Sequence, residues 1–128
     1  MTTTNNAIDY VAVVERYLAA WNETDAVKRR ELLAAAFTED AAYTDPLADV
    51  ASRDALDMVI GAVQGQFAGL VFTLGGPVDG HHDVVRFTWN LGPEGGEALV
   101  VGFDVAQIAA DGRVRKVSGF LDKVPAGL

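Results

Sequence analysis

The hydrophobic pattern of the chain changes its period once, near residue 70, and this change limits the folds available to it. Before that point apolar residues recur three or four positions apart, which predicts helices over about residues 7–21, 24–37 and 52–67. After it, alternation and short apolar runs predict about four strands between residues 70 and 124. Helices followed by a strand meander indicate an α+β fold, with the helices on one face of a curved, mostly antiparallel sheet.

Chain length and composition fit one domain of this class. The 128 residues are half apolar and only 22% charged, so the chain can bury a real core. We expect a single domain over residues 1–128 with one pocket.

Polar residues stand where the first two helices are expected to start. Asn6 followed by Asp9 resembles a capping box. Thr24 can cap the second helix, and Asp25 suits the positive end of that helix's dipole. The charged segment KRRE, residues 28–31, is expected to be a solvated helix face.

The charge balance and the lack of cysteine exclude several classes of partner and chemistry. Ten Lys and Arg against 18 Asp and Glu give a net charge of −8, which repels nucleic acid and anionic membranes. Without cysteine there is no disulfide, thiolate nucleophile or Cys-based metal site. The chain has no signal-like leader and no apolar run of the roughly 18–20 residues needed to span a bilayer. We expect a cytoplasmic protein.

Asp104 is the most informative single residue, because it interrupts the apolar run ALVVGFDVAQIA in a predicted central strand. Burial disfavours a charged carboxylate, so this group must be ion-paired, accept several hydrogen bonds, or keep its proton with a raised pKa. A neutral acid in an apolar pocket can donate to a developing oxyanion. The structural alternative is a buried ion pair with Arg86, Arg113 or Arg115.

Asp45 and Tyr17 are further candidates. Asp45 lies in YTDP, after a short extended piece and before the rigid Pro46, a suitable place for a side chain at a cavity mouth. Its structural alternative is a turn aspartate that bonds its own backbone. Tyr17 flanks the apolar stripe of the first helix, one turn before Trp21, so its hydroxyl needs a partner. It can equally be a core tyrosine.

Several segments together resemble a known enzyme family. VVERYLAAWN, then LLAAAFTEDAAYTDP, and later VVGFD followed by DGR, are similar to the bacterial Δ5-3-ketosteroid isomerases, which belong to the nuclear transport factor 2-like and SnoaL-like group. The resemblance covers nearly the whole chain and is best over residues 13–22, 37–47 and 97–121. It implies a cone-shaped domain that encloses an apolar pocket.

The resemblance also implies roles for the three candidates. Tyr17 matches the oxyanion-binding tyrosine of the family, Asp45 its proton-transferring base, and Asp104 its protonated oxyanion-binding acid. Together they would isomerise a double bond in a hydrophobic cyclic ketone, with no cofactor and no metal. The side chains expected to contact the substrate are Trp21, Phe67, Phe87 and Trp89.

Departures from the family pattern concern the polar residues near the cavity. Strand alternation places Phe87 and Trp89 on one face, and His82 and Arg86 on the other. Arg86 and Asp122 replace a small apolar residue and a glycine of the family pattern. Facing outward they would form an ion pair at a surface or dimer contact, whereas facing inward either would favour a more polar substrate.

The cluster Asp79, His81, His82 and Asp83 also suggests a metal site. Adjacent strand residues point to opposite faces, so only alternate members could share an ion. Solvated turn residues are the simpler interpretation, and we expect no metal.

Other functions remain open beside the isomerase. A SnoaL-like polyketide cyclase, a hydratase or an epoxide hydrolase would keep the pocket and use Asp104 or Asp122 as acid or base. A ligand-binding or dimerisation module would leave Asp104 merely ion-paired. In each case the open side of such a sheet predicts a homodimer, as is usual in this group.

Overall fold

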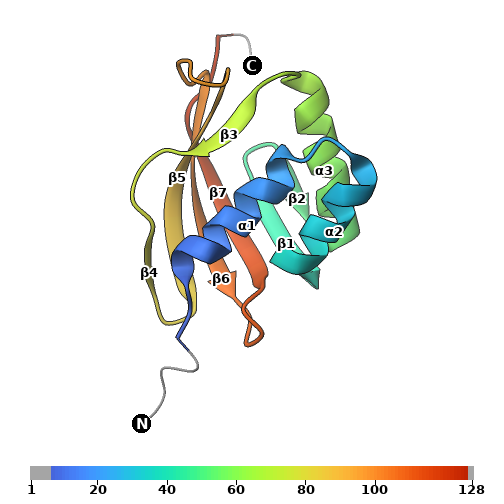
Figure 1. Cartoon of the computed structure of the whole chain (residues 1–128), viewed down its shortest axis with the longest axis vertical. Coiled ribbons are helices and arrows are strands. Elements are labelled where there is room, and N and C mark those ends of the chain that lie inside the picture. Colours follow the sequence, from blue (N-terminus) through green and yellow to red (C-terminus); the bar gives the residue numbers. More distant parts are fainter. Residues whose placement is uncertain (1–6, 127–128) are drawn as a thin grey trace.

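Three helices lie on one face of a single seven-stranded sheet in the computed structural model, which describes residues 7–126 (Figure 1). The helices are α1 (Tyr10–Asn22), α2 (Ala26–Ala36) and α3 (Arg53–Gln66). The strands are β1 (Phe37–Asp45), β2 (Ala48–Val50), β3 (Val71–Leu74), β4 (Asp79–His81), β5 (Val84–Gly92), β6 (Val100–Ile108) and β7 (Val114–Lys123). The predicted α+β class, with helices on a curved and mostly antiparallel sheet, is confirmed.

The order of strands places β1, which follows the first two helices, beside the C-terminal strand β7. The sheet runs β2-β1-β7-β6-β5-β3, with β4 also paired to β5. All pairs are antiparallel except β1 and β7, which are parallel. As a result, the end of β1 lies next to the middle of β7 and close to β6.

Two sequence predictions about the strands are wrong. Strands β1 and β2 form between α2 and α3, where only a break with a short extended piece was expected. Apolar and polar residues do not alternate regularly in these polar segments, and β1 forms because it pairs with β7. Residues 70–124 form five strands instead of about four, because His82 adopts a positive φ of 49° and the tight turn there separates β4 from β5.

The helix starts follow capping chemistry, with one change of residue. Asp9 and Ser52 cap α1 and α3, each accepting a hydrogen bond from a backbone N–H of the first turn. Asp25, rather than the expected Thr24, caps α2, because its carboxylate accepts from two backbone N–H groups. Asn6, the other half of the expected capping box, lies outside the described residues.

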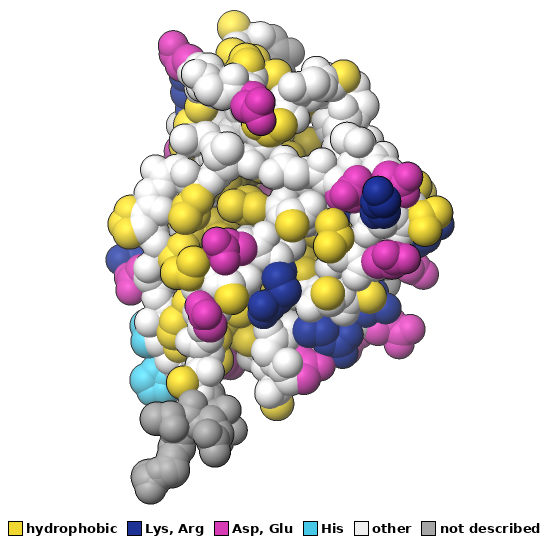
Figure 2. Space-filling view, viewed as in Figure 1, with side chains coloured by type: hydrophobic (Ala, Val, Ile, Leu, Met, Phe, Trp, Pro, Cys, Tyr) yellow, Lys and Arg dark blue, Asp and Glu magenta, His cyan; other side chains and the backbone are white. Residues whose placement is uncertain are grey.

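Successive side chains of β5 and β6 point to opposite faces of the sheet, one buried under the helices and one more exposed. Phe87, Trp89 and Leu91 point toward the helices and are buried, as their spacing predicts. On the helix side, hydrophobic side chains remain visible between charged ones (Figure 2). Val11 of α1 and Leu74 of β3 are exposed large hydrophobic residues. Within residues 7–126 no helix is long and apolar enough to cross a membrane.

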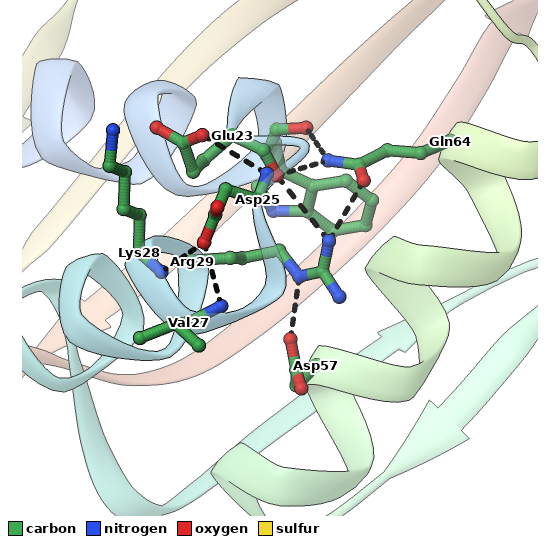
Figure 3. A network of polar contacts seen from close by, with 8 residues as sticks. Glu23, Asp25, Val27, Lys28, Arg29, Asp57 and Gln64 are labelled. Atoms are coloured by element: carbon green, nitrogen blue, oxygen red, sulfur yellow. Dashed lines mark hydrogen bonds and ion pairs between the residues drawn. The ribbon is translucent and has the colours of Figure 1, made fainter.

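A buried arginine ties the three helices together (Figure 3). Arg29, expected on a solvated face, is only 8% exposed, and its Nε donates to Asp57 Oδ1 of α3 at 2.6 Å. Its Nη1 donates to Gln64 Oε1 at 2.9 Å. Gln64 Nε2 in turn donates to the carbonyl oxygens of Trp21 and Glu23, at 3.0 and 2.8 Å. The network therefore fixes the C-terminal end of α1 against α3.

Removal of this arginine should destabilise the fold. Arg29→Met leaves the Asp57 carboxylate without its partner, which we expect to lower the free energy of unfolding by about 3 kcal/mol. Chemical denaturation measures the loss, with Arg30→Met, at an exposed neighbouring position, as the matched control. Equal stability of the two variants would contradict a structural role for the network.

Candidate active site

Tyr17, Asp45 and Asp104 come from three different elements and line one cavity between the helices and the sheet. Tyr17 is on α1, which crosses the sheet in front of β6 (Figure 1), and Asp104 is in the middle of β6. The Tyr17 hydroxyl donates to Asp104 Oδ2 at 2.5 Å. Asp45 is the last residue of β1 and lines the same cavity. The fold thus brings all three predicted residues together.

The walls of the cavity are otherwise almost entirely apolar. Trp21, Phe67 and Trp89, three of the expected substrate contacts, line it, together with aliphatic side chains. Phe87 does not line it, because its ring packs edge-on against the Tyr17 ring at 5.1 Å, behind the catalytic candidates. The cavity volume is about 50 Å³. Ligand pockets of roughly 300–1,000 Å³ are usual, so a ring-containing ligand requires the side chains at the mouth to move.

Asp104 is a buried carboxyl group that forms no ion pair with any of the residues that the structure describes. It is only 1% exposed. Burial raises its pKa to about 6, and the nearby Asp45 carboxylate acts in the same direction. Hydrogen bonds from the side chains of Tyr17 and Trp89 act in the opposite direction and moderate the rise. Asp104 therefore keeps its proton over a range in which an ordinary aspartate has lost it.

The ion-pair interpretation of Asp104 is wrong. Each candidate arginine pairs with another aspartate: Arg86 with Asp79 at 2.9 Å, Arg113 with Asp111 at 2.8 Å, and Arg115 with Asp83 at 3.5 Å. All three pairs are substantially exposed. None of these three arginines thus compensates the burial of Asp104.

The phenol of Tyr17 stays protonated in this environment. Burial raises the pKa of Tyr17 well above its usual value, and the neighbouring Asp104 raises it further. A phenol that keeps its proton is a permanent hydrogen-bond donor. Tyr17 therefore offers a donor at the same point in the cavity as Asp104.

Asp45 is both a turn residue and a cavity residue. Its Oδ1 accepts hydrogen bonds from the backbone N–H groups of Leu47 and Ala48, both at 2.8 Å, as the turn interpretation expects. Its Oδ2 accepts from the Tyr43 hydroxyl at 2.5 Å. Every contact is a donor to the carboxylate, which suits an ionised group.

Sequence reasoning missed two residues of the site. Tyr43 lies two positions before Asp45, and this spacing on a strand, which places both side chains on one face, could have indicated it. Gly119 of β7 pairs with Asp104 across the sheet. A Cβ there would lie 2.7 Å from Asp104 Oδ1 and 3.3 Å from Asp45 Cβ, so the glycine makes room for both carboxyl groups. No local signal distinguishes it from other glycines.

The remaining polar candidates lie outside the cavity. Arg86 and Asp122 are exposed, and Arg86 pairs with Asp79 instead of the expected Asp122. His82 is exposed in the turn between β4 and β5, where its carbonyl oxygen accepts a hydrogen bond from the Tyr10 hydroxyl. None of them makes the cavity more polar. That the histidines bind no metal stays a prediction.

Comparisons with known proteins agree with this fold. The family model of the SnoaL-like domain matches residues 14–117, a range that includes all three candidates. A crystal structure of a proposed SnoaL-like isomerase from Agrobacterium tumefaciens is 37% identical over 88% of this chain and 97% of its own, with a TM-score of 0.83.

More distant structures share the architecture. A proposed polyketide cyclase from Sinorhizobium meliloti is 20% identical, covering 84% of this chain and 93% of its own, with a TM-score of 0.66. An NTF2-like protein of unknown function from Cytophaga hutchinsonii is 10% identical over 95% of both chains, with a TM-score of 0.67. At these identities the likeness extends to the fold alone. No curated protein matches the chain.

The raised pKa of Asp104 should make stability depend on pH. Between the ordinary value of 3.8 and about 6, the folded state binds a proton that the unfolded state has released. Stability contributed by this group is therefore full below pH 4 and falls by about 3 kcal/mol as the pH rises through 6. Asp104→Asn should lack this fall. Denaturation of both proteins at pH 4–8 measures it, and parallel curves would contradict the protonated assignment.

Proposed function

The chain belongs to the SnoaL-like domain family, and we propose that it catalyses proton transfer next to the carbonyl group of a hydrophobic ketone, isomerising a double bond as ketosteroid isomerases do. The observation that carries the proposal is the buried hydrogen bond between Tyr17 and Asp104, which lies in the same apolar cavity as Asp45. Two proton donors and one acceptor in one hollow are what enolisation requires.

The donors would act on the carbonyl oxygen. Removal of a proton from the adjacent carbon leaves negative charge on that oxygen, and donors already aimed at it stabilise the charge without solvent reorganisation. The Tyr17 hydroxyl would move its hydrogen bond from Asp104 Oδ2 to the carbonyl oxygen, and the protonated carboxyl group of Asp104 would donate the second hydrogen bond to that oxygen. The developing charge disfavours a second anion beside it, so substrate binding further favours the protonated form of Asp104.

Asp45 would move the proton. Its carboxylate takes the proton from the carbon next to the carbonyl, giving a dienolate whose charge rests on the oxygen. It then returns the same proton to the far carbon of the conjugated system, which restores the carbonyl group and shifts the double bond. The exchange leaves Asp45 ionised and the enzyme unchanged.

The cavity lining indicates the class of substrate. Among residues 7–126, those that line the cavity include two carboxyl groups and two phenols but no lysine, arginine or histidine, so none of them would pair with an anionic ligand. The aromatic walls favour a neutral, apolar ring system. We therefore propose a neutral cyclic ketone, with no cofactor.

Other reactions in the same pocket would use its residues differently. A polyketide cyclase, hydratase or epoxide hydrolase would rely on Asp104 as acid, whereas Asp122 is exposed and outside the cavity. A binding module would have no need of Asp45 as a base. The cytoplasmic location expected from the sequence stays a prediction.

The outer face of the sheet supports a homodimer, which we propose as the assembled form. Phe103 of β6 and Phe120 of β7 are paired neighbours on the face away from the helices. Phe120 is 56% exposed. Valines of β6 on the same face are half-buried. An exposed apolar strip of this kind is commonly covered by a partner, and a second copy offers the same surface.

The isomerase proposal predicts a specific loss of activity. Asp45→Asn should lower kcat by about 10²–10⁴-fold, because the amide cannot accept the proton. The assay follows the conjugated-enone absorbance formed from a β,γ-unsaturated ketosteroid and from a one-ring β,γ-unsaturated ketone. Asp49→Asn, at an exposed position of β2, is the matched control. No enone from either ketone, or full activity of Asp45→Asn, would overturn the proposal.

The dimer proposal predicts an effect of charge at the outer face. Phe120→Glu should shift the protein toward the monomer, since burial of two symmetry-related carboxylates opposes association. Sedimentation velocity measures the change. Met58→Glu, which is 76% exposed on α3 at the helix side, should leave the assembly unchanged. A wild-type monomer would refute the dimer.

A further inference from the structure

We propose that Tyr43 is a positioning residue for the Asp45 carboxylate, and that Asp45 Oδ2 is the oxygen that accepts and returns the substrate proton. The inference rests on the proposed role of Asp45 as the base. It goes beyond that role by naming the reacting atom and the group that holds it.

The contact between Tyr43 and Asp45 follows from strand geometry. The two residues are two positions apart on β1, so their side chains point to the same face of the sheet. The Tyr43 hydroxyl donates to Asp45 Oδ2 at 2.5 Å. Both residues line the cavity. The phenol therefore holds the carboxylate at the edge where a ligand would bind.

The other carboxylate oxygen is held by the backbone. Oδ1 accepts from the N–H groups of Leu47 and Ala48, in the turn that follows Pro46. Together with the Tyr43 bond, these contacts fix both oxygens, so the carboxylate plane has one orientation. A base fixed in this way needs no rotamer search before it meets the substrate carbon.

Counting acceptor sites identifies the reacting oxygen. An ionised carboxylate has about four lone-pair sites, two on each oxygen. The two backbone donors occupy both sites on Oδ1, and the Tyr43 hydroxyl occupies one site on Oδ2. The site left for a proton is the second one on Oδ2.

Tyr43 is suited to this task because its buried hydroxyl keeps its proton and stays a hydrogen-bond donor. The side chain is 3% exposed, and its ring packs against the Trp21 ring at 5.5 Å. Burial raises the pKa of Tyr43 far above its usual value, and the neighbouring Asp104 and Asp45 add to the effect. The phenol thus remains a donor and does not compete with Asp45 for the substrate proton.

Tyr43→Phe tests the proposal, since it keeps the ring and removes only the hydroxyl. We expect kcat for ketone isomerisation to fall about 10- to 100-fold while KM changes by no more than about twofold. Tyr10→Phe, which removes the phenol that donates to the His82 carbonyl outside the cavity, should match wild type in both respects.

A crystal structure of the variant gives a readout independent of turnover. In Tyr43→Phe we expect the Asp45 carboxylate to rotate about its Cβ–Cγ bond and to lose a backbone hydrogen bond. An unrotated carboxylate overturns the positioning role even if the enzyme is an active isomerase. A rotated carboxylate in a protein without isomerase activity would instead sustain the positioning role and refute the proposed function. Should Tyr43→Phe fail to fold, Tyr43→Met supplies the same tests.

Discussion

Burial of a carboxyl group in the middle of β6 is the constraint on which the site depends. An aspartate that is 1% exposed without a cationic partner requires hydrogen-bond donors, space and a proton. The Tyr17 hydroxyl donates to Asp104 because α1 crosses the sheet at this point and brings the two groups together. Gly119 of β7 supplies the space. The path of α1 and the composition of β6 and β7 thus accommodate the Asp104 side chain. An apolar residue at this position would need neither the hydrogen-bond donor nor the proton.

The two carboxyl groups of the cavity are held in opposite ways. Asp104 is deep in an apolar wall, where burial favours its protonated form. Asp45 stands at the end of β1, where two backbone N–H groups and the Tyr43 phenol donate to it and suit the charged form. Separation of an acid from a base within one small hollow is what enolisation needs. The Arg29 network supports the hollow from outside, since it fixes the ends of α1 and α3 that carry Trp21 and Phe67.

The spacing of apolar residues along the chain predicted the helices and the central strands, because this spacing is regular in those elements. Asp104 was recognisable because it breaks such a period. Strands β1 and β2 were missed, since polar residues dominate them and a parallel partner over 70 positions away orders β1. The roles of Gly119 and Arg29 depend on neighbours from other elements, which no pattern along the chain reveals. Tyr43 could have been predicted as a site residue, because its spacing from Asp45 on an extended segment already places both side chains on one face.

The most direct test of this account is a ¹³C NMR titration of the aspartate carboxyl groups, with the Asp104 signal assigned by its loss in Asp104→Asn. This carboxyl group should keep its proton until about pH 6. An Asp104 carboxyl group that ionises near the ordinary value of 3.8 would contradict the central claim that the cavity holds an acid beside a base.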